Sequence, residues 1–206
     1  QIRNRTVDII VGTQMLAKGH DFPAITLVGV ICADLSLSLP DFRASERTFQ
    51  LLAQVAGRAG RGEEPGRVIM QTFNPDHFTI KAARNQDYLE FFNQETPFRK
   101  ALMYPPFSRM IQLKISGKNA DKTREHARLV ADLLERFNTR EPQAQILGPI
   151  EAAIQKISSR YRWQILIKCV SSINISRMVS AIVRDPAIRK VKSVSVVVDV
   201  DPYSLL

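Results

Sequence analysis

The residues best suited to chemistry lie in the segment QVAGRAGR, which runs from Gln54 to Arg61. If the preceding helix continues through this segment, Gln54, Arg58 and Arg61 recur at i, i+4 and i+7 and share one face. Guanidinium groups can bind two phosphate oxygens at once and stay charged at any working pH. Arginines placed in this way can stabilise charge on a transferred phosphoryl group, an effect of about 10³- to 10⁵-fold in rate.

Glycines separate these polar side chains. Gly57 and Gly60 carry no Cβ, so we expect the backbone here to let another surface approach closely. The same pattern also fits a solvated basic helix end with a glycine cap. The segment by itself does not separate the two interpretations.

The elements that position the segment are those of a sheet-centred α/β region over residues 1–75. The apolar runs 7–11 and 26–33 predict strands of a parallel sheet buried on both faces, and 67–73 predicts a further strand. A helix is predicted from about Ser45, and its buried stripe comprises Phe49, Leu52, Ala53 and Ala56. Residues 76–103 read as a helical connector that ends before two prolines, Pro105 and Pro106.

Residues 104–206 show a different pattern of apolar residues. Alternating apolar residues predict strands, the first of them half-exposed, and 3.6-residue periodicity predicts helices. The strands are expected at 111–115, 145–150, 161–169 and 194–200, and the helices at 120–137 and 174–184. The order β-α-β-β-α-β is that of a ferredoxin-like α+β domain, a fold that assigns no function by itself.

The composition favours a polyanionic partner. Lys and Arg number 29 against 20 Asp and Glu, a net charge of +9, and such an excess favours phosphate neutralisation. Cys32 and Cys169 are the only cysteines and lie far apart, so no metal site is expected within this chain. No apolar run is long enough for a membrane span. The chain begins with Gln1, and we expect it to be part of something longer.

Two of these segments carry a family resemblance. GTQMLAKGHDFP at 12–23 resembles motif V of superfamily 2 helicases, and QVAGRAGR at 54–61 resembles motif VI. Further segments extend the resemblance to the PriA family of primosomal helicases over essentially the whole chain. They are PPF at 105–107, GPIEAAI at 148–154, RYRWQILIK at 160–168 and the final VDVDPYSLL.

The resemblance implies the C-terminal part of a RecA-like motor lobe, with a parallel sheet, followed by the ferredoxin-like domain. It implies that Arg58 and Arg61 reach the phosphates of ATP held by the other motor lobe, with Arg61 as the arginine finger. Gln54 would then lie near the γ-phosphate or its attacking water.

For the motif V segment, the resemblance implies contacts of Gly12 and Thr13 with the backbone of the translocated DNA strand. Gly19 and Asp21 would couple this loop to the nucleotide, and Lys18 would be a weaker DNA contact. A strand-to-helix turn that satisfies its own backbone is the competing interpretation of Thr13 and Asp21. Lys18 also fits a solvated loop lysine.

The resemblance implies that the C-terminal domain binds branched or forked DNA and the single-strand DNA-binding protein. Arg160 and Arg162 are candidate DNA contacts, whereas Trp163 shares a strand face with apolar residues and is expected in the core. A second basic cluster, Arg189, Lys190 and Lys192, is read as a solvated strand edge.

The sequence also departs from a complete helicase. It contains no GxxxxGK[ST] loop, no acidic Mg²⁺-binding box and no cysteine-rich zinc module. The resemblance implies that ATP, Mg²⁺ and zinc are bound in the full-length protein, and without a P-loop we expect no ATP turnover by this chain alone.

The expected function is that of a DNA helicase restarting stalled replication forks with other primosome proteins. The resemblance implies a bacterial cytoplasmic, nucleoid-associated location and no membrane partner. The alternative is a non-enzymatic DNA- or protein-binding module with a residual half motor lobe.

Overall fold

The computed structural model describes residues 7–14, 25–60, 65–140, 144–170 and 172–205. The chain forms two compact units, each considered by itself below. The first comprises Gln1–Leu39 and Arg43–Thr96, and the second comprises Pro40–Phe42 and Pro97–Leu206. The second unit is therefore discontinuous in sequence, because a tripeptide from the middle of the first unit belongs to it. The predicted ranges 1–75, 76–103 and 104–206 stay a prediction.

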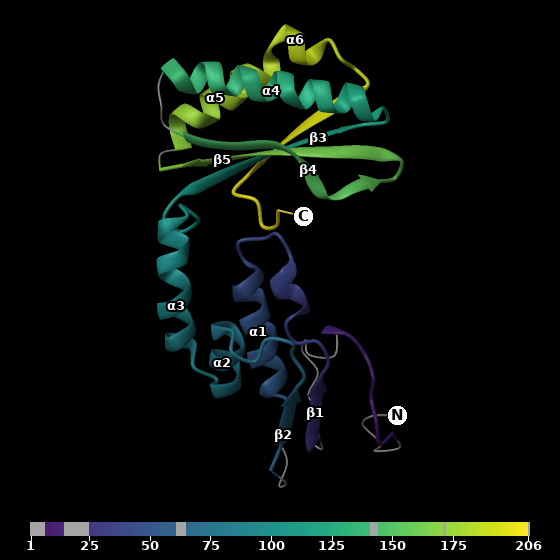
Figure 1. The fold of residues 1–206 in the computed structure, drawn as a ribbon, viewed down its shortest axis with the longest axis vertical. Coiled ribbons are helices and arrows are strands. Elements are labelled where there is room, and N and C mark those ends of the chain that lie inside the picture. Colours follow the sequence, from purple (N-terminus) through teal and green to yellow (C-terminus); the bar gives the residue numbers. More distant parts are fainter. Residues whose placement is uncertain (1–6, 15–24, 61–64, 141–143, 171, 206) are drawn as a thin grey trace. The chain divides into compact units, whose positions relative to one another are not determined.

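The first unit contains a two-stranded parallel sheet with helices beside it (Figure 1). Strand β1 (Leu27–Val30) pairs with β2 (Arg67–Met70), and Leu27 lies opposite Arg67. Both strands are shorter than predicted. Between them lie the 3-10 helix η3 (Leu35–Ser38) and α1 (Ala44–Ala56), and after β2 come α2 (Phe78–Asn85) and α3 (Tyr88–Ala101).

The core of the first unit lies mainly among its helices. The predicted stripe of α1 is buried at Phe49 and Leu52. The ring of Phe91 stacks on Phe49 with centroids 4.5 Å apart, and Phe78 lies 5.9 Å from it on the other side. These aromatic contacts join α1, α2 and α3, so the predicted helical connector provides part of a core.

The expected strand at 7–11 is not present. Residues 7–14 form no strand, and the side chains of Ile9 and Val11 are 80% and 91% exposed. A parallel strand needs a paired neighbour and cover on both faces. In the described part of the first unit, residues 7–14 have no paired strand and their apolar side chains are exposed. An apolar run alone was therefore not sufficient to predict a strand.

The second unit is built on a four-stranded antiparallel sheet in the order β4-β5-β3-β6. Its elements follow the predicted order, with one short helix added before the last strand. They are β3 (Arg109–Gly117), α4 (Ala120–Arg140), β4 (Ala144–Ile157), β5 (Arg160–Cys169), α5 (Ser172–Arg184), α6 (Pro186–Arg189) and β6 (Val194–Val200). Over the described residues, the chain is thus a mixed α/β protein with one parallel and one antiparallel sheet.

Helices α4 and α5 cover one face of this sheet (Figure 1). Period-2 alternation turns Ile111, Leu113 and Ile115 of β3 toward the helices, and these side chains are fully buried. Val130 and Leu134 of α4 meet them at helical spacing. Trp163 packs against the same cluster, as predicted.

The opposite face of the sheet is also buried at its centre, which corrects the prediction of a half-exposed β3. Gln112 is 2% exposed, and its Nε2 donates to Gln164 Oε1 at 2.7 Å and to the carbonyl of Leu205 at 3.2 Å. Lys168 is 4% exposed. The C-terminal residues and the segment after α3 provide this cover. Such contacts join residues far apart in the sequence, so local periodicity cannot predict them.

Strand β4 is longer than predicted because its pairing with β5 is interrupted twice. The register shifts between Leu147 and Ile150, and again between Glu151 and Lys156. Such bulges add residues to one strand and mask the alternation from which strands are recognised. Beyond the second shift, β4 and β5 form a hairpin whose turn holds Ser158 and Ser159 at positive φ.

Candidate functional site

Helix α1 ends just before the two arginines of QVAGRAGR. Gly57 is its C-cap, and the amide of Arg58 donates to the carbonyl of Val55 at 3.0 Å. The helix therefore does not continue to Arg61, and the glycine cap of the alternative interpretation is present at Gly57. Gln54 is exposed in the last turn of α1, and Arg58 is half-buried in the turn that follows. Helical spacing consequently does not place the two arginines on one face.

The glycines of this segment hold the base of a loop together. Gly60 has φ +74, and a Cβ on it would lie 2.7 Å from the amide nitrogen of Gly66. A Cβ on Gly66 would in turn overlap the backbone of Gly60. The close approach that the sequence analysis expected at Gly60 is therefore made by the backbone of Gly66. By contrast, a Cβ on Gly57 would meet nothing nearer than 3.6 Å.

Backbone hydrogen bonds fix this loop base against the strand segment that includes β1. The amide of Gly60 donates to the carbonyl of Ile25 at 3.1 Å, and that of Arg67 donates to Thr26 at 2.7 Å. Gly60 and Arg67 thus have defined positions beside the sheet. Arg61 itself lies outside the described residues.

The motif V residues are only partly described. Gly12 and Thr13 are exposed and lie outside regular helix and strand. Their predicted contact with DNA stays a prediction. Lys18, Gly19 and Asp21 lie outside the described residues. The structure therefore does not bring the motif V and motif VI residues together into one described site.

A carboxylate that the sequence analysis missed orders the loops after β1 and β2. Asp34 Oδ2 accepts hydrogen bonds from the hydroxyl of Thr72 at 2.8 Å, from the amide of Phe73 at 2.8 Å and from that of Asn74 at 3.0 Å. The hydroxyl of Thr72, together with these amides, holds the pKa of Asp34 below its ordinary value. The donors all come from the segment after β2, so Asp34 joins the loops that follow the two strands.

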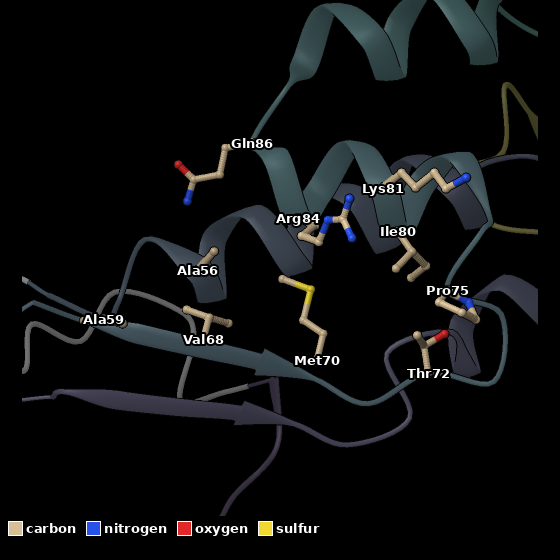
Figure 2. A pocket seen from close by; sticks show the side chains of 11 residues that line it. Ala56, Ala59, Val68, Met70, Thr72, Pro75, Ile80, Lys81, Arg84 and Gln86 are labelled. Atoms are coloured by element: carbon tan, nitrogen blue, oxygen red, sulfur yellow. The ribbon is translucent and has the colours of Figure 1, made fainter.

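A pocket of about 560 Å³ opens in the first unit between the end of α1, strand β2 and helix α2 (Figure 2). Val68 and Met70 face it from β2, and Ile80, Lys81 and Arg84 face it from α2. Lys81 is paired with Asp76 at 2.8 Å. The lining includes neither Gln54 nor Arg58.

The two candidate DNA contacts of the second unit are tied to the backbone. Arg160 donates through Nε to Ser116 Oγ at 3.2 Å and through a terminal nitrogen to the Ser116 carbonyl at 2.7 Å. Arg162 donates to the carbonyl of Ile154 at 3.4 Å. A guanidinium has five N–H donors, so these bonds leave donors for a phosphate. Arg160 is thus held by β3 and Arg162 by β4.

A stack of rings and cations surrounds the tripeptide 40–42 within the second unit. The ring of Phe42 stacks on Tyr104 with centroids 5.3 Å apart and planes at 9°. Arg99 lies over the outer side of this pair at Phe42, and Lys168 Nζ lies 3.7 Å from the centroid of Tyr104. Burial lowers the pKa of Lys168, and its Nζ donates to the carbonyl of Leu102 at 2.9 Å.

The carboxylate of Asp41 joins the same tripeptide to the C-terminal segment. Its Oδ2 accepts from Ser204 Oγ at 2.9 Å and from the amide of Leu205 at 3.2 Å. Asp41 and Ser204 are more than 160 positions apart in sequence, so no local pattern could have indicated this contact.

Neither a metal centre nor a membrane span is found in the part of the chain that the structure describes. Among the described residues, no three His, Cys, Asp or Glu side chains lie close enough together to hold a metal ion. No helix formed by these residues is both long enough and apolar enough to span a bilayer.

Comparison with known proteins decides the family. Residues 100–203 match the family model described as the primosomal protein N C-terminal domain. The chain belongs to the PriA family. Replication restart protein PriA of Synechocystis sp. is 43% identical over 207 residues, which cover 100% of this chain and 24% of that protein.

Other members of the PriA family align in the same way. The protein of that name from Bacillus subtilis is 40% identical over 97% of this chain, and the one from Rickettsia felis is 39% identical over 99% of it. The chain spans 25% and 30% of their respective lengths. It thus corresponds to a C-terminal portion of the PriA family proteins.

Proposed function

We propose that the chain is the C-terminal portion of an ATP-dependent DNA helicase that remodels branched DNA and loads the replication machinery at stalled forks. The observation that carries this proposal is its alignment, over 97% to 100% of its length, with relatives named replication restart protein PriA. Because the chain spans about a quarter of those relatives, the rest of the motor would lie in the remainder of a longer protein.

The proposal includes a finer assignment of the two units. The first would be part of a RecA-like motor lobe, for which parallel pairing of β1 and β2 is supporting evidence. The second would be a ferredoxin-like domain. Its βαββαβ succession, the strand order β4-β5-β3-β6 and the helices on one face support that assignment.

In this proposal, Arg58 and Arg61 contact the phosphates of ATP, and Gln54 orients the γ-phosphate or its water. The exposed amide of Gln54 and the loop base fixed by Gly60 and Gly66 support a preorganised site. Amide and guanidinium groups fit phosphate oxygens, whereas Mg²⁺ prefers carboxylate oxygens and water. The chain's part would be phosphate contacts, and Mg²⁺ and zinc would be held elsewhere in the longer protein.

The remaining roles follow the same division. Gly12, Thr13 and Lys18 would contact the translocated strand, and Gly19 and Asp21 would couple that loop to the nucleotide. Branched DNA, the single-strand DNA-binding protein and other primosome proteins would be the partners. The net charge of +9 supports a polyanionic partner.

The test is DNA-stimulated ATP hydrolysis by a full-length protein that ends in this sequence. Arg61→Ala should lower kcat by about 10³-fold or more if Arg61 is an arginine finger, with DNA binding retained. The matched control is Arg136→Ala, an exposed arginine of α4, which should leave kcat unchanged. Normal hydrolysis by the Arg61→Ala protein would contradict the catalytic role.

A second candidate function is a non-enzymatic DNA- or protein-binding module. The absence of a GxxxxGK[ST] loop from the 206 residues favours it for the chain in isolation. We expect the purified chain to hydrolyse no ATP, because nothing in its sequence cradles the β- and γ-phosphates. Hydrolysis by the chain alone that disappears in the Arg61→Ala variant would refute this expectation.

A further inference from the structure

The tripeptide Pro40–Phe42, which we call the anchor, belongs to the second unit although both of its neighbours in sequence belong to the first. The chain passes between the units at 39/40, again at 42/43 and once more at 96/97. The first crossing follows the C-cap of η3, and the second precedes the N-cap of α1. Whatever holds the anchor in the second unit therefore also fixes the chain that enters α1.

The anchor is held by contacts of two kinds, all of them within the second unit. Asp41 is 8% exposed, and its carboxylate accepts two hydrogen bonds from the C-terminal segment. The ring of Phe42 stacks on Tyr104, and the guanidinium carbon of Arg99 lies 5.6 Å from its centroid. Hydrogen bonds, ring stacking and cation–π contacts all depend on direction. They fix the orientation of the anchor as well as its position.

Helix α1 begins directly after the anchor and has no side-chain cap at its start. Its N-cap is Arg43, whose side chain makes no capping hydrogen bond, whereas Ser, Thr, Asp or Asn commonly fills this position. Backbone bonding is established at once, because the amide of Arg47 donates to the carbonyl of Arg43 at 2.8 Å. The start of α1 is thus joined to the anchor by a single residue and is not defined by a cap of its own.

The other end of α1 carries the motif VI residues. The helix has 13 residues, and at about 1.5 Å per residue it is about 20 Å long. Gln54 lies in its last turn, and the amide of Arg58 donates to the carbonyl of Val55 at 3.0 Å. Both residues are therefore attached to the same regular helix that starts at the anchor.

The middle of α1 is held separately, in the core of the first unit. Phe49 and Leu52 are 6% and 1% exposed and pack among the helices of that unit. A rod that is held only near its middle can still tilt, whereas a second fixed point at its start also sets its direction. The anchor supplies that second point.

We propose that Asp41 and Phe42 are positioning residues for ATP hydrolysis. By holding the residues before α1 in the second unit, they set the direction of the helix that presents Gln54 and Arg58. The inference rests on the proposed function, in which these two side chains approach ATP held by the other motor lobe. A misplacement of about 1 Å in a reacting geometry can cost about 10²-fold in rate. The second unit thereby contributes to hydrolysis without touching the nucleotide.

The experiment measures DNA-stimulated ATP hydrolysis, as kcat and as KM for ATP, with a full-length protein that ends in this sequence. Phe42→Ala removes the stacked ring, and Phe42→Tyr keeps one. Asp41→Asn retains the shape of the side chain, so it tests the anchor even if Phe42→Ala does not fold. Phe137→Ala is the matched control, because it removes a 40% exposed ring from α4 of the same unit. All proteins are assayed well below their thermal unfolding midpoints.

We expect Phe42→Ala to lower kcat about tenfold or more and Asp41→Asn to lower it about threefold. KM for ATP should stay within about twofold, because the other motor lobe holds the nucleotide in the proposed function. Phe42→Tyr and the control Phe137→Ala should keep kcat within about twofold of the unaltered protein. A kcat loss without a KM change, reversed by Phe42→Tyr, is the expected signature.

A second background separates positioning from a general loss of stability. Arg58→Lys keeps a cation but loses the planar fork of the guanidinium, so its placement relative to phosphate matters less. If Phe42 acts through Arg58, Phe42→Ala should cost less than about threefold in the Arg58→Lys protein. Asp41→Asn is combined with Arg58→Lys in the same way. An equal loss in both backgrounds would mean that the anchor only stabilises the fold, and the inference would be wrong.

Other results would also overturn the inference. Normal kcat in Asp41→Asn and in folded Phe42→Ala would show that the anchor does not position motif VI. The same loss in Phe137→Ala would assign the effect to any lost ring of the second unit. If the unaltered protein hydrolyses no ATP, or Arg61→Ala hydrolyses it normally, the proposed function fails and the inference with it. An inactive Arg61→Ala protein beside normal anchor variants refutes the inference alone.

Discussion

The two units use apolar sequence in different ways. In the second unit, apolar residues alternate along the strands and are buried beneath α4 and α5. In the first unit, β1 and β2 are continuous apolar runs, yet Leu27 and Ile69 remain 59% and 49% exposed. A parallel sheet needs cover on both faces, whereas an antiparallel sheet can be completed by one helical layer. The second unit thus contains its whole sheet core, and the first buries its apolar surface mainly among helices.

The largest change in stability is expected at Leu134 in the second unit. The side chain is fully buried between α4 and the sheet, so Leu134→Ala should reduce the free energy of unfolding by about 2–5 kcal/mol. Trp163, the only tryptophan, reports on this core, and its emission during urea unfolding gives the midpoint. Val197→Ala is the control, because this exposed side chain should contribute less than about 0.5 kcal/mol. Similar losses for both would mean that the core is not closed.

In the first unit, we expect the sensitive position to be a glycine at the loop base. Gly60→Ala forces a side chain into positive φ and against the backbone of Gly66, and should destabilise the β1–β2 region by more than about 1 kcal/mol. Gly57→Ala is the matched control, because a Cβ there meets its nearest atom at 3.6 Å, an ordinary van der Waals distance. Hydrogen exchange of peptides from β1 and β2, followed by mass spectrometry, measures the difference. Equal exchange in the two variants would show that the loop base is not tightly packed.

The smallest predicted effect is a pH dependence confined to the second unit. His126 is buried in α4, and both ring nitrogens lack a hydrogen-bond partner among the described residues. Burial lowers its pKa below 6.5. The unfolded chain therefore binds a proton at a higher pH than the folded chain, and stability is lost as the pH falls below 6.5.

The urea midpoint from Trp163 emission should accordingly decrease below pH 6.5, and His126→Leu should remove most of that decrease. His77 provides a comparison in the first unit, since burial lowers its pKa as well and its Nδ1 accepts from the amide of Thr79. His77→Asn retains a capping oxygen and should leave the Trp163 midpoint unchanged. The same pH dependence in His126→Leu as in the unaltered chain would assign the effect to other groups.

The sequence predicted the second unit well because its elements have strong local periods. The helix 120–137 and the strand 194–200 were placed within three residues of α4 and β6. Strand β4 was shortened in the prediction because its register shifts interrupt the alternation. The burial of Lys168 was not predicted, because the residues that cover it are distant in the sequence.

The candidate site was less predictable from sequence. The roles of the motif VI residues stay a prediction, and the sequence left open whether α1 continues to Arg61 or ends at a glycine cap, which the structure places at Gly57. The requirement for Gly60 and Gly66 arises from a contact between two backbones, which no pattern of side chains expresses. Asp34 and Asp41 were missed because they act through partners more than 35 positions away.

The discontinuity of the second unit has a consequence for dissecting the gene. A fragment that begins at Pro97 would contain every strand of the antiparallel sheet but would lack the tripeptide 40–42. Tyr104 would lose its stacked ring, and Ser204 and the amide of Leu205 would lose their shared acceptor. We expect a synthetic peptide that contains Pro40–Phe42 to bind such a fragment in trans, because it would restore these contacts.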